Sequence, residues 1–337
     1  MLRLPPAAVS RPRSLGEALE ALSSPDARVL AGGTDLLVAL KLGLGSGPGP
    51  ARLVCLSELP LAGIETEDGG YRLGATTTLW DLSRWNPPPK DRALGILAEA
   101  SRQVAAPPLQ SRATLGGNLC LDTRCVFYNQ SAFWRSGRPA CHKTGGRTCH
   151  AVPGGSECFA CHQSDLAPVA VALGATVRLE SAAGTRDLPA ESLYSGKGLR
   201  PLTLAPGELL TSVSVPASGA RAGTGWEKLR LRKGLEFALA SAAVYLEAAE
   251  DGVCREACVV LGAVGSGPLR VREAEEALRG TTVGEDALAA AAGAAARAAR
   301  PVKNVDTTPS YRREVAGVAV VRATRRAWDM ATGREHR

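Results

Sequence analysis

The stretch Leu30-Ala31-Gly32-Gly33-Thr34-Asp35-Leu36-Leu37 places two adjacent glycines between a short apolar strand and the start of a helix. Glycine adopts positive φ angles and lets backbone N–H groups approach a phosphate, and the helix N-terminus adds a favourable dipole. The later segment Ala113-Thr114-Leu115-Gly116-Gly117-Asn118 repeats the arrangement. Either segment alone is more simply an ordinary glycine turn. Neither has the glycine spacing of a nicotinamide-nucleotide turn or an ATP-binding loop, so the sequence disfavours both kinds of site.

Apolar periodicity around these turns predicts strands that alternate with helices, the first helix beginning at a capping box from Ser14 to Glu17. The segment 218–223 resembles a linker. The expected strands are 28–31, 53–56, 71–75, 176–180, 208–215, 226–231, 238–248 and 257–264. The expected helices are 15–22, 34–42, 90–105, 166–173, 271–279, 286–300 and 309–328, with one more after Thr78.

The composition is that of a folded chain with ample core. Its 337 residues are 45% hydrophobic and 22% charged, which favours two or three domains and excludes disorder. No apolar run approaches the roughly 20 residues that span a bilayer, and the first residues lack the apolar core of a signal peptide. The chain has a net charge of +7, but its basic residues are not interleaved with aromatic residues as they are on a nucleic-acid-binding surface. We therefore expect a cytoplasmic protein that binds neither membrane nor nucleic acid.

The stretch 119–163 concentrates the unusual residues, holding six of the nine cysteines and three of the four histidines. It shows no sustained helical or strand periodicity, and so long an irregular loop in a folded protein is usually functional. A cubane iron–sulfur cluster needs four thiolates, one for each iron. The alternative is a structural zinc site built on Cys158-x-x-Cys161 with His150 or His162. Disulfides are disfavoured in a reducing compartment.

Several motifs in consistent order resemble the FAD-binding subunit of the molybdenum hydroxylases, the relatives of xanthine dehydrogenase and carbon monoxide dehydrogenase. Besides the two glycine turns, these motifs are Ser164-Asp165-Leu166-Ala167-Pro168, Glu227-Lys228-Leu229-Arg230, Leu235-Glu236-Phe237-Ala238 and Ser310-Tyr311-Arg312-Arg313. The resemblance implies an α+β fold. Two α/β FAD-binding subdomains of the vanillyl-alcohol-oxidase (PCMH) type, 1–58 and 59–217, would precede a C-terminal domain with a small antiparallel sheet and helices. That domain, 222–337, would be of the CO-dehydrogenase-flavoprotein kind.

By this resemblance the two turns wrap the FAD pyrophosphate, and Thr76 and Gln110 lie beside the cofactor. Asp165 binds FAD from the second subdomain, and Lys228 contacts the flavin, where an ammonium would stabilise negative charge on its reduced form. Without the resemblance, Lys228 is a solvated strand residue. The implied cofactor-binding residues are Leu30, Ala31, Gly32, Gly33, Thr34, Asp35, Leu36, Leu37, Thr76, Gln110, Thr114, Leu115, Gly116, Gly117, Asn118, Asp165 and Lys228.

The cysteine-rich stretch resembles one branch of this family, the β subunit of 4-hydroxybenzoyl-CoA reductase, whose flavin domain carries an inserted [4Fe-4S] loop. The matching segments are Asn118-Leu119-Cys120, Asp122-Thr123-Arg124-Cys125, Phe127-Tyr128-Asn129-Gln130 and Trp134-Arg135-Ser136-Gly137. The implied cluster ligands are Cys125, Cys141, Cys149 and Cys158. Cys120 and Cys161 are then extra residues of unassigned role.

The resemblance implies an electron-relay subunit without catalytic residues of its own. Electrons from ferredoxin would enter the cluster, pass to FAD and continue to a [2Fe-2S] subunit and a molybdenum-cofactor subunit, which would dehydroxylate 4-hydroxybenzoyl-CoA. The assembly would be a heterotrimer, possibly dimerised. One alternative is the same subunit in a molybdenum hydroxylase that oxidises an aromatic or heterocyclic substrate, and another is a zinc-stapled binding protein. Five basic residues are either solvated loop charges or a landing surface for ferredoxin: Arg124, Arg135, Arg138, Lys143 and Arg147.

Overall fold

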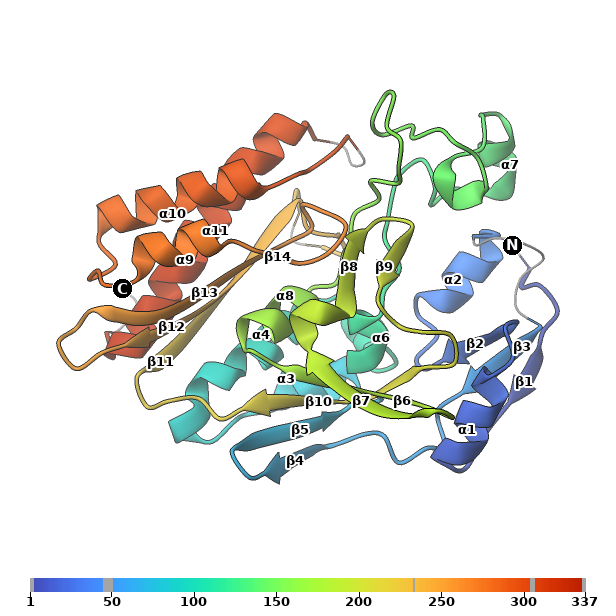
Figure 1. Ribbon diagram of the computed structural model, residues 1–337, viewed down its shortest axis with the longest axis horizontal. Helices are drawn as coiled ribbons and strands as arrows, with labels where there is room; N and C mark the ends of the chain where they lie inside the picture. The colour runs from blue at the N-terminus through green and yellow to red at the C-terminus, as the bar shows by residue number, and fades with distance from the viewer. Residues whose placement is uncertain (1–2, 45–50, 233, 304–306, 335–337) are drawn as a thin grey trace.

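A three-stranded parallel sheet near the N-terminus carries the first glycine turn at the end of one strand (Figure 1). The computed structural model describes residues 3–44, 51–232, 234–303 and 307–334. Helix α1 begins where predicted, because the Ser14 hydroxyl accepts a hydrogen bond from the Glu17 N–H. In the order β1-β3-β2, the sheet comprises β1 (Ala8–Ser10), β2 (Ala27–Leu30) and β3 (Arg52–Cys55), accompanied by helices α1 (Leu15–Leu22) and α2 (Leu36–Lys41).

The second sheet has five strands, and each strand is antiparallel to its neighbours. The latest strand in the chain, β10, lies at the centre and joins the strands before and after the cysteine-rich stretch. A large core forms between this sheet and its helices. The sheet order is β4 (Ile64–Glu67), β5 (Gly70–Gly74), β10 (Leu209–Pro216), β6 (Thr176–Ser181) and β7 (Gly184–Pro189). The associated helices are α3 (Leu79–Arg84), η1 (Pro89–Gly95), α4 (Ile96–Arg102), α5 (Pro107–Gln110), α6 (Leu115–Leu119), α8 (Leu166–Ala172) and η3 (Ala190–Leu193).

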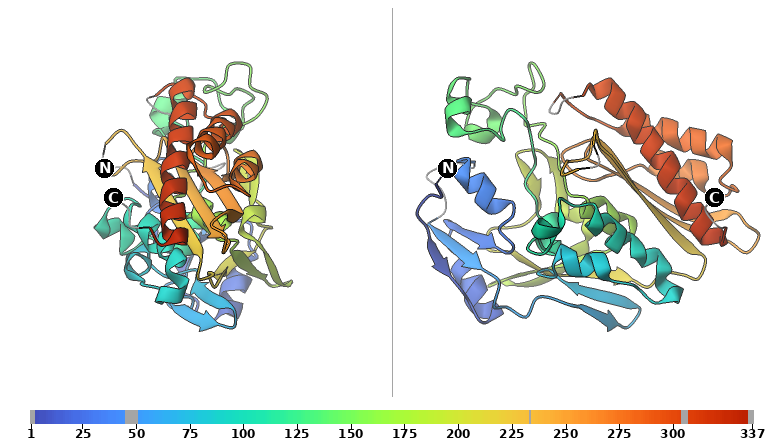
Figure 2. Two further views of the ribbon diagram at one scale, coloured as in Figure 1. Left: turned by 90° about the vertical axis from the view of Figure 1, so that its left-hand side faces the viewer. Right: turned by 180° about the vertical axis from the view of Figure 1, so that it is seen from behind.

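The third sheet is antiparallel and is covered on one face by three helices (Figures 1 and 2). A Cβ on Gly223 or Gly225 would lie 2.0 or 1.9 Å from carbonyl oxygens of helix α11, so glycine lets this helix lie directly on strand β11. Trp226 faces the other way and packs into the core of the second sheet. The elements are β11 (Ala222–Leu229), β12 (Ala240–Ala248), β13 (Cys254–Gly262), β14 (Leu269–Arg270), α9 (Arg272–Leu278), α10 (Glu285–Ala298) and α11 (Pro309–Thr332).

The predicted α+β fold with a C-terminal antiparallel sheet is therefore confirmed, but two local predictions need correction. Residues 218–221 do connect β10 to β11, but strand β11 already begins at Ala222, inside the segment 218–223 that resembled a linker. The first residues of this strand are small, and this allows helix α11 to pack directly against the strand. The predicted helix 90–105 is broken near its start, where Asp91 leaves helical geometry. The carboxylate of Asp91 accepts hydrogen bonds from the Tyr71 hydroxyl at 2.7 Å and the Ser218 N–H at 3.0 Å.

The cysteine-rich stretch, called the insert below (residues 119–163), contains helix α7 (Ala132–Ser136), η2 (His142–Thr144) and otherwise irregular chain, as predicted. Its neck is closed by two backbone hydrogen bonds between Arg124 and Cys161, of 2.6 and 2.8 Å. The Arg135 guanidinium donates to the carbonyls of Leu42 and Gly43, which ties α7 to the end of α2. Figures 1 and 2 show α7 above α2.

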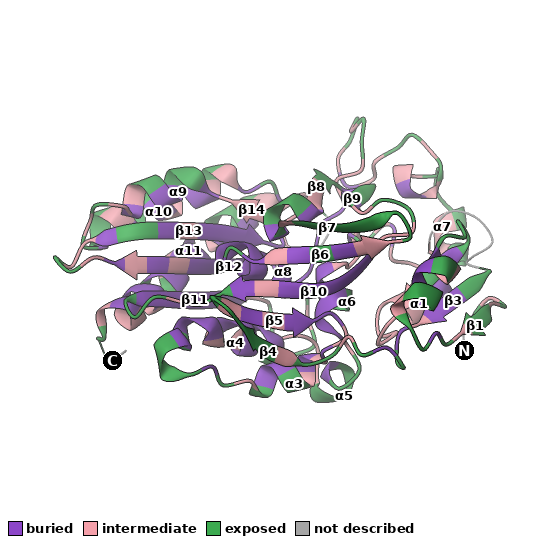
Figure 3. Cartoon of the chain, turned by 60° about the horizontal axis from the view of Figure 1, so that its bottom comes forward, coloured by how far each residue is buried: buried purple, intermediate pink, exposed green. Residues whose placement is uncertain are grey.

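A short hairpin supports the insert from the opposite side. It is formed by β8 (Tyr194–Lys197) and β9 (Arg200–Leu202). The Gly198 carbonyl at its tip accepts a 2.6 Å hydrogen bond from the buried Thr123 hydroxyl. Figure 3 shows that buried residues continue from the second sheet into the third, whereas the insert is mostly exposed or half-buried. Within the described residues, no helix is both long and apolar enough to cross a membrane.

Candidate functional site

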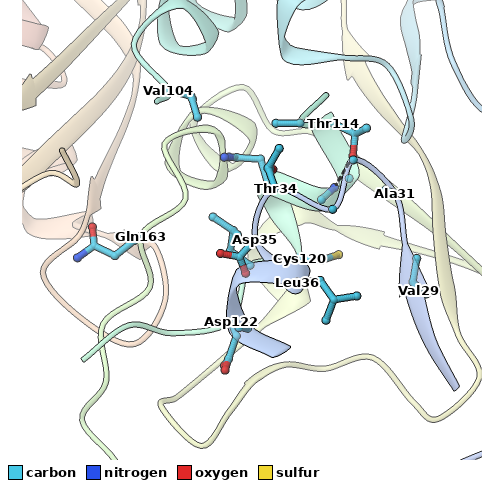
Figure 4. A pocket seen from close by; sticks show the side chains of 18 of the residues that line it. Val29, Ala31, Thr34, Asp35, Leu36, Val104, Thr114, Cys120, Asp122 and Gln163 are labelled. Carbon is cyan, nitrogen blue, oxygen red and sulfur yellow. Dashed lines mark hydrogen bonds between the residues drawn. The ribbon is translucent and has the colours of Figure 1, made fainter. Parts of the chain in front are cut away.

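A cavity of about 700 Å³ lies where the three sheets and the insert meet. The first glycine turn and α2 form one wall, and the second turn with α6 forms another. The β11–β12 loop closes a third side with Leu235, Glu236 and Phe237, and residues 120–124 of the insert form the last wall. A volume within the usual range for a bound organic cofactor makes this the leading candidate site. Figure 4 shows Thr34 and Thr114 on adjacent turns at its edge.

The structure brings the two glycine turns into direct backbone contact. A Cβ on Gly32 would lie 1.8 Å from the carbonyl oxygen of Arg112, just before the second turn. Gly33 has φ of +71°, a conformation that favours glycine. In the second turn the Thr114 hydroxyl accepts a 3.1 Å hydrogen bond from the Gly117 N–H. Both turns thus present tightly held backbone to the same cavity, the arrangement that a pyrophosphate requires.

A buried ion pair lies in the cavity wall and joins the C-terminal sheet to the chain that precedes helix α8. The Lys228 ammonium donates to an Asp165 carboxylate oxygen at 2.6 Å and to the Gln103 carbonyl at 3.0 Å. The two side chains are only 2% and 8% exposed. Burial raises the pKa of Asp165, although the nearby Lys228 charge opposes that shift. Leaving the resemblance aside, we expected Lys228 to be a solvated strand residue. That expectation is wrong, because the side chain is buried.

Thirteen of the seventeen predicted cofactor-binding residues line the cavity. Gln110 does not line it: its amide donates to the carbonyls of Arg102 and Val104 and so holds the chain beside the cavity. Leu115 is buried in the core, while Leu30 and Leu37 enclose the Gly33 turn from behind. The residues that do line the cavity are Ala31, Gly32, Gly33, Thr34, Asp35, Leu36, Thr76, Thr114, Gly116, Gly117, Asn118, Asp165 and Lys228.

Two cavity residues were missed or misassigned from the sequence. Gln163 has a buried amide oxygen without a hydrogen-bond partner among the described residues, and it lines the cavity (Figure 4). Arg124 forms an ion pair with Asp35 across the cavity wall, and its guanidinium lies 5.6 Å from the Phe237 ring. It is therefore neither a solvated loop charge nor part of an open landing surface. Asp35 lies 89 positions before Arg124, so the sequence around Arg124 gave no indication of this ion pair.

The four predicted cluster ligands lie in one neighbourhood of the insert. All four are half-buried free thiols. The pKa of Cys125 is raised to about 11, mainly by burial and to a smaller extent by the nearby Cys158 and Cys149. Burial also raises the pKa of Cys158, with contributions from Cys141 and Cys149. Thiols that influence one another in this way fit the donor set of an iron–sulfur cluster, once a cluster's positive charge stabilises the thiolates.

No three His, Cys, Asp or Glu side chains in the described part of the chain converge as ligands of a single metal ion. A cubane spreads its four thiolates over four irons and so does not need such close convergence. Cys161 lies in the neck of the insert, where its thiol donates to the His162 carbonyl. Cys120 lies instead in the cavity wall, where burial raises its pKa to about 12. The two remaining cysteines of the insert thus lie in its neck and in the cavity wall.

The family model described as the FAD binding domain in molybdopterin dehydrogenase matches residues 5–218. The chain is an FAD-binding subunit of the molybdenum hydroxylase family. The C-terminal part of this flavin subunit, 227–327, matches the CO dehydrogenase flavoprotein C-terminal domain. The flavin subunit is 34% identical to the aldehyde oxidoreductase FAD-binding subunit PaoB of Escherichia coli, over 77% of its own length and 82% of PaoB. It is 28% identical to the carbon monoxide dehydrogenase medium chain of Hydrogenophaga pseudoflava, over 94% and 95% of the two chains.

Solved structures agree with this assignment. The flavin subunit superposes on a chain of reconstituted CO dehydrogenase from Oligotropha carboxidovorans with a TM-score of 0.79 at 28% identity, covering 97% of this chain and 99% of that one. Quinoline 2-oxidoreductase from Pseudomonas putida 86 gives 0.77 at 25% identity, with 98% and 99% coverage. The fold therefore extends over nearly the whole chain.

Proposed function

We propose that the flavin subunit transfers electrons between FAD in the 700 Å³ cavity and a [4Fe-4S] cluster held by Cys125, Cys141, Cys149 and Cys158. One observation carries the proposal: residues 120–124 of the insert line the cavity, and the first of the four thiols follows at the next residue. A cluster held by these thiols would lie directly behind the cavity wall, and this supports a short electron path between the cluster and FAD.

The chain's own residues would hold FAD in a defined orientation. The backbone of the two glycine turns would bind the pyrophosphate, and Lys228 would face the flavin from the buried pair with Asp165. FAD supplies the exchange between two-electron and one-electron chemistry. The protein's part is to position the cofactor, to keep water from most of the cavity and to place a cation beside the flavin.

We further propose that the subunit assembles with a molybdenum-cofactor subunit and a [2Fe-2S] subunit. The relatives named medium chain or medium subunit, in CO dehydrogenase and nicotine 6-hydroxylase, support this assembly. The molybdenum subunit would carry the substrate site, so this chain would set the electron path and not the substrate.

Two substrate classes are candidates. The cysteine pattern of the insert supports a 4-hydroxybenzoyl-CoA reductase that takes electrons from ferredoxin. The names of relatives that act on aldehydes, nicotine and nicotinate support an oxidising enzyme instead. Purified complex should be assayed with 4-hydroxybenzoyl-CoA and reduced ferredoxin, and separately with aldehydes and N-heterocycles and an electron acceptor. Turnover in only one assay decides between the two classes.

The cofactor proposal is tested by composition. Anaerobically purified complex should contain one FAD and four additional irons for each flavin subunit beyond those of the [2Fe-2S] partner. Cys149→Ser should lose these four irons and retain FAD. Cys161→Ser is the matched control, because a zinc site on Cys158-x-x-Cys161 would need that thiol and the cubane would not. Zinc in place of the four irons, or iron lost only in Cys161→Ser, would contradict the proposal.

A further inference from the structure

The insert contains a buried lysine, an unusual residue for an otherwise open loop. The Lys143 side chain is 5% exposed, and its ammonium lies 2.5 Å from a carboxylate oxygen of Asp122. The same ammonium lies 3.4 Å from the Thr123 carbonyl and 5.1 Å from the centre of the Tyr128 ring. Lysine is almost never so buried unless it is paired. Lys143 is therefore a desolvated cation with fixed partners, whereas the sequence had grouped it with the exposed charges of the loop.

Lys143 connects the cavity wall to the part of the insert that carries the predicted cluster ligands. Its partners Asp122 and Thr123 belong to the cavity wall. Its own short helix, η2, starts directly after Cys141, and the Thr144 hydroxyl at the end of that helix donates to the Cys141 sulfur at 3.7 Å. The ammonium also faces the ring of Tyr128, whose backbone N–H donates to the Cys125 carbonyl at 2.9 Å. The ammonium thus lies beside the segments that carry two of the four cysteines, Cys125 and Cys141.

The other cations of the insert are engaged elsewhere or exposed. Arg124 pairs with Asp35, and Arg135 donates to the carbonyls that end α2. Arg138 is exposed and stacks on Trp134 with its guanidinium 3.7 Å from the ring, and Arg147 is also exposed. Among the described residues of the insert, Lys143 is the cation that combines burial with a position beside segments of the four-cysteine set.

We propose that Lys143 is a positioning residue that raises the reduction potential of the insert's cluster, and that Asp122 opposes it by partly neutralising the ammonium. The inference rests on the proposed function. Four thiolates give a cubane a net negative charge, and one-electron reduction increases that charge by one. A desolvated cation favours the more negative state, because screening by water is weak there. The electron comes from an external reductant, and no bond is made or broken.

If Lys143 only held the insert against the cavity wall, the expected result would be different. Its substitution would lower cluster occupancy or stability but leave the potential of the remaining cluster unchanged. Lys143→Met removes the charge at nearly constant length, and Lys143→Arg retains it. Asp122→Asn leaves the ammonium without its counter-charge and should act in the opposite direction. Arg147→Met removes an exposed cation of the same insert and serves as the matched control.

The experiment is a dithionite titration of the whole complex, with the reduced cluster followed by EPR and the flavin by absorbance. We expect Lys143→Met to lower the cluster potential by an amount that corresponds to at least a tenfold weaker uptake of one electron, about 59 mV. Asp122→Asn should raise it, while Lys143→Arg and Arg147→Met should match the wild type.

An unchanged cluster potential in iron-replete Lys143→Met, or a potential in Asp122→Asn at or below that of the wild type, overturns the inference. If Lys143→Met fails to retain iron, Asp122→Asn decides alone by the direction of its shift. Wild-type complex without the four additional irons overturns the proposed cluster itself, an outcome that iron analysis separates from the other results.

Discussion

The Lys228 ammonium and the Asp165 carboxylate lie 2.6 Å apart, although 63 residues separate them in the chain. Lys228 belongs to strand β11 of the third sheet, and Asp165 directly precedes helix α8 beneath the second. One buried pair therefore joins the C-terminal sheet to the FAD-binding part at the wall of the cavity.

Lys228→Met should destabilise the subunit by about 3–5 kcal/mol, because it leaves the Asp165 carboxylate buried without its counter-charge. Asp165→Leu combined with Lys228→Met should lose less than the sum of the two single substitutions. Urea unfolding of FAD-free and FAD-loaded protein measures both effects. Equal losses for the double variant and for the sum would show that the pair is not coupled.

Gly32→Ala should abolish tight FAD binding, because the added Cβ would lie 1.8 Å from the backbone oxygen of Arg112. The two glycine turns would have to separate, and the cavity wall would change shape. Gly16→Ala is the matched control: that glycine lies on the exposed side of α1 with nothing within 4 Å of the added carbon. The control should retain one FAD per chain and gain slightly in stability. Flavin absorbance after gel filtration measures the content of both.

Acid should destabilise the subunit through His162, whose pKa is lowered by burial from 6.5 to about 4. The unfolded chain takes up the proton first, so this part of the stability is present above pH 6.5 and is lost as the pH falls toward 4. We expect a loss of about 2 kcal/mol between pH 7.5 and pH 5 from this residue. His162→Phe retains an aromatic ring against Tyr194 and should not show this loss. Urea unfolding at the two pH values compares both proteins, and equal losses would contradict the assignment.

Replacement of residues 125–160 by Asn-Gly should give a folded flavoprotein without the additional iron. The backbone hydrogen bonds between Arg124 and Cys161 already hold the two ends as an antiparallel pair, which a two-residue turn can close. Circular dichroism should stay close to that of the full chain, and most of the FAD should be retained, because only Tyr128 and Asn129 of the cavity lining are removed. Loss of FAD from an otherwise folded variant would show that the insert is needed to complete the cavity.

Local sequence patterns predicted the main helices and strands, because the residues that start or form each element are close together in the chain. Ser14 begins α1 and Thr78 begins α3, each by accepting the hydrogen bond expected of a capping side chain. Several short strands were missed, β7 among them, because their exposed side chains show no alternation of polar and apolar residues. The domain bounds 1–58, 59–217 and 222–337 remain a prediction, because the core of the second sheet also includes Trp226, Ala243 and Val260 of the third.

The site was less predictable, since its decisive contacts join distant segments. The glycine turns were recognisable, but their contact through Gly32 and Arg112 was not. Gln110 was placed beside the cofactor, yet its amide satisfies two backbone carbonyls. Arg124 and Lys143 read as solvated charges because their acidic partners, Asp35 and Asp122, lie 89 and 21 residues away. Burial of a charge depends on such long-range pairs, which composition and spacing do not report.

The neck of the insert has a consequence for how such a subunit can arise. The chain enters and leaves the insert at one antiparallel residue pair, Arg124 and Cys161. Gain or loss of the insert beyond this pair therefore leaves the strand order of the three sheets unchanged. A single in-frame event in the gene could therefore add or remove residues 125–160, and with them the proposed cluster ligands, without reordering the rest of the fold. The insert is in this sense a modular addition to the flavin subunit.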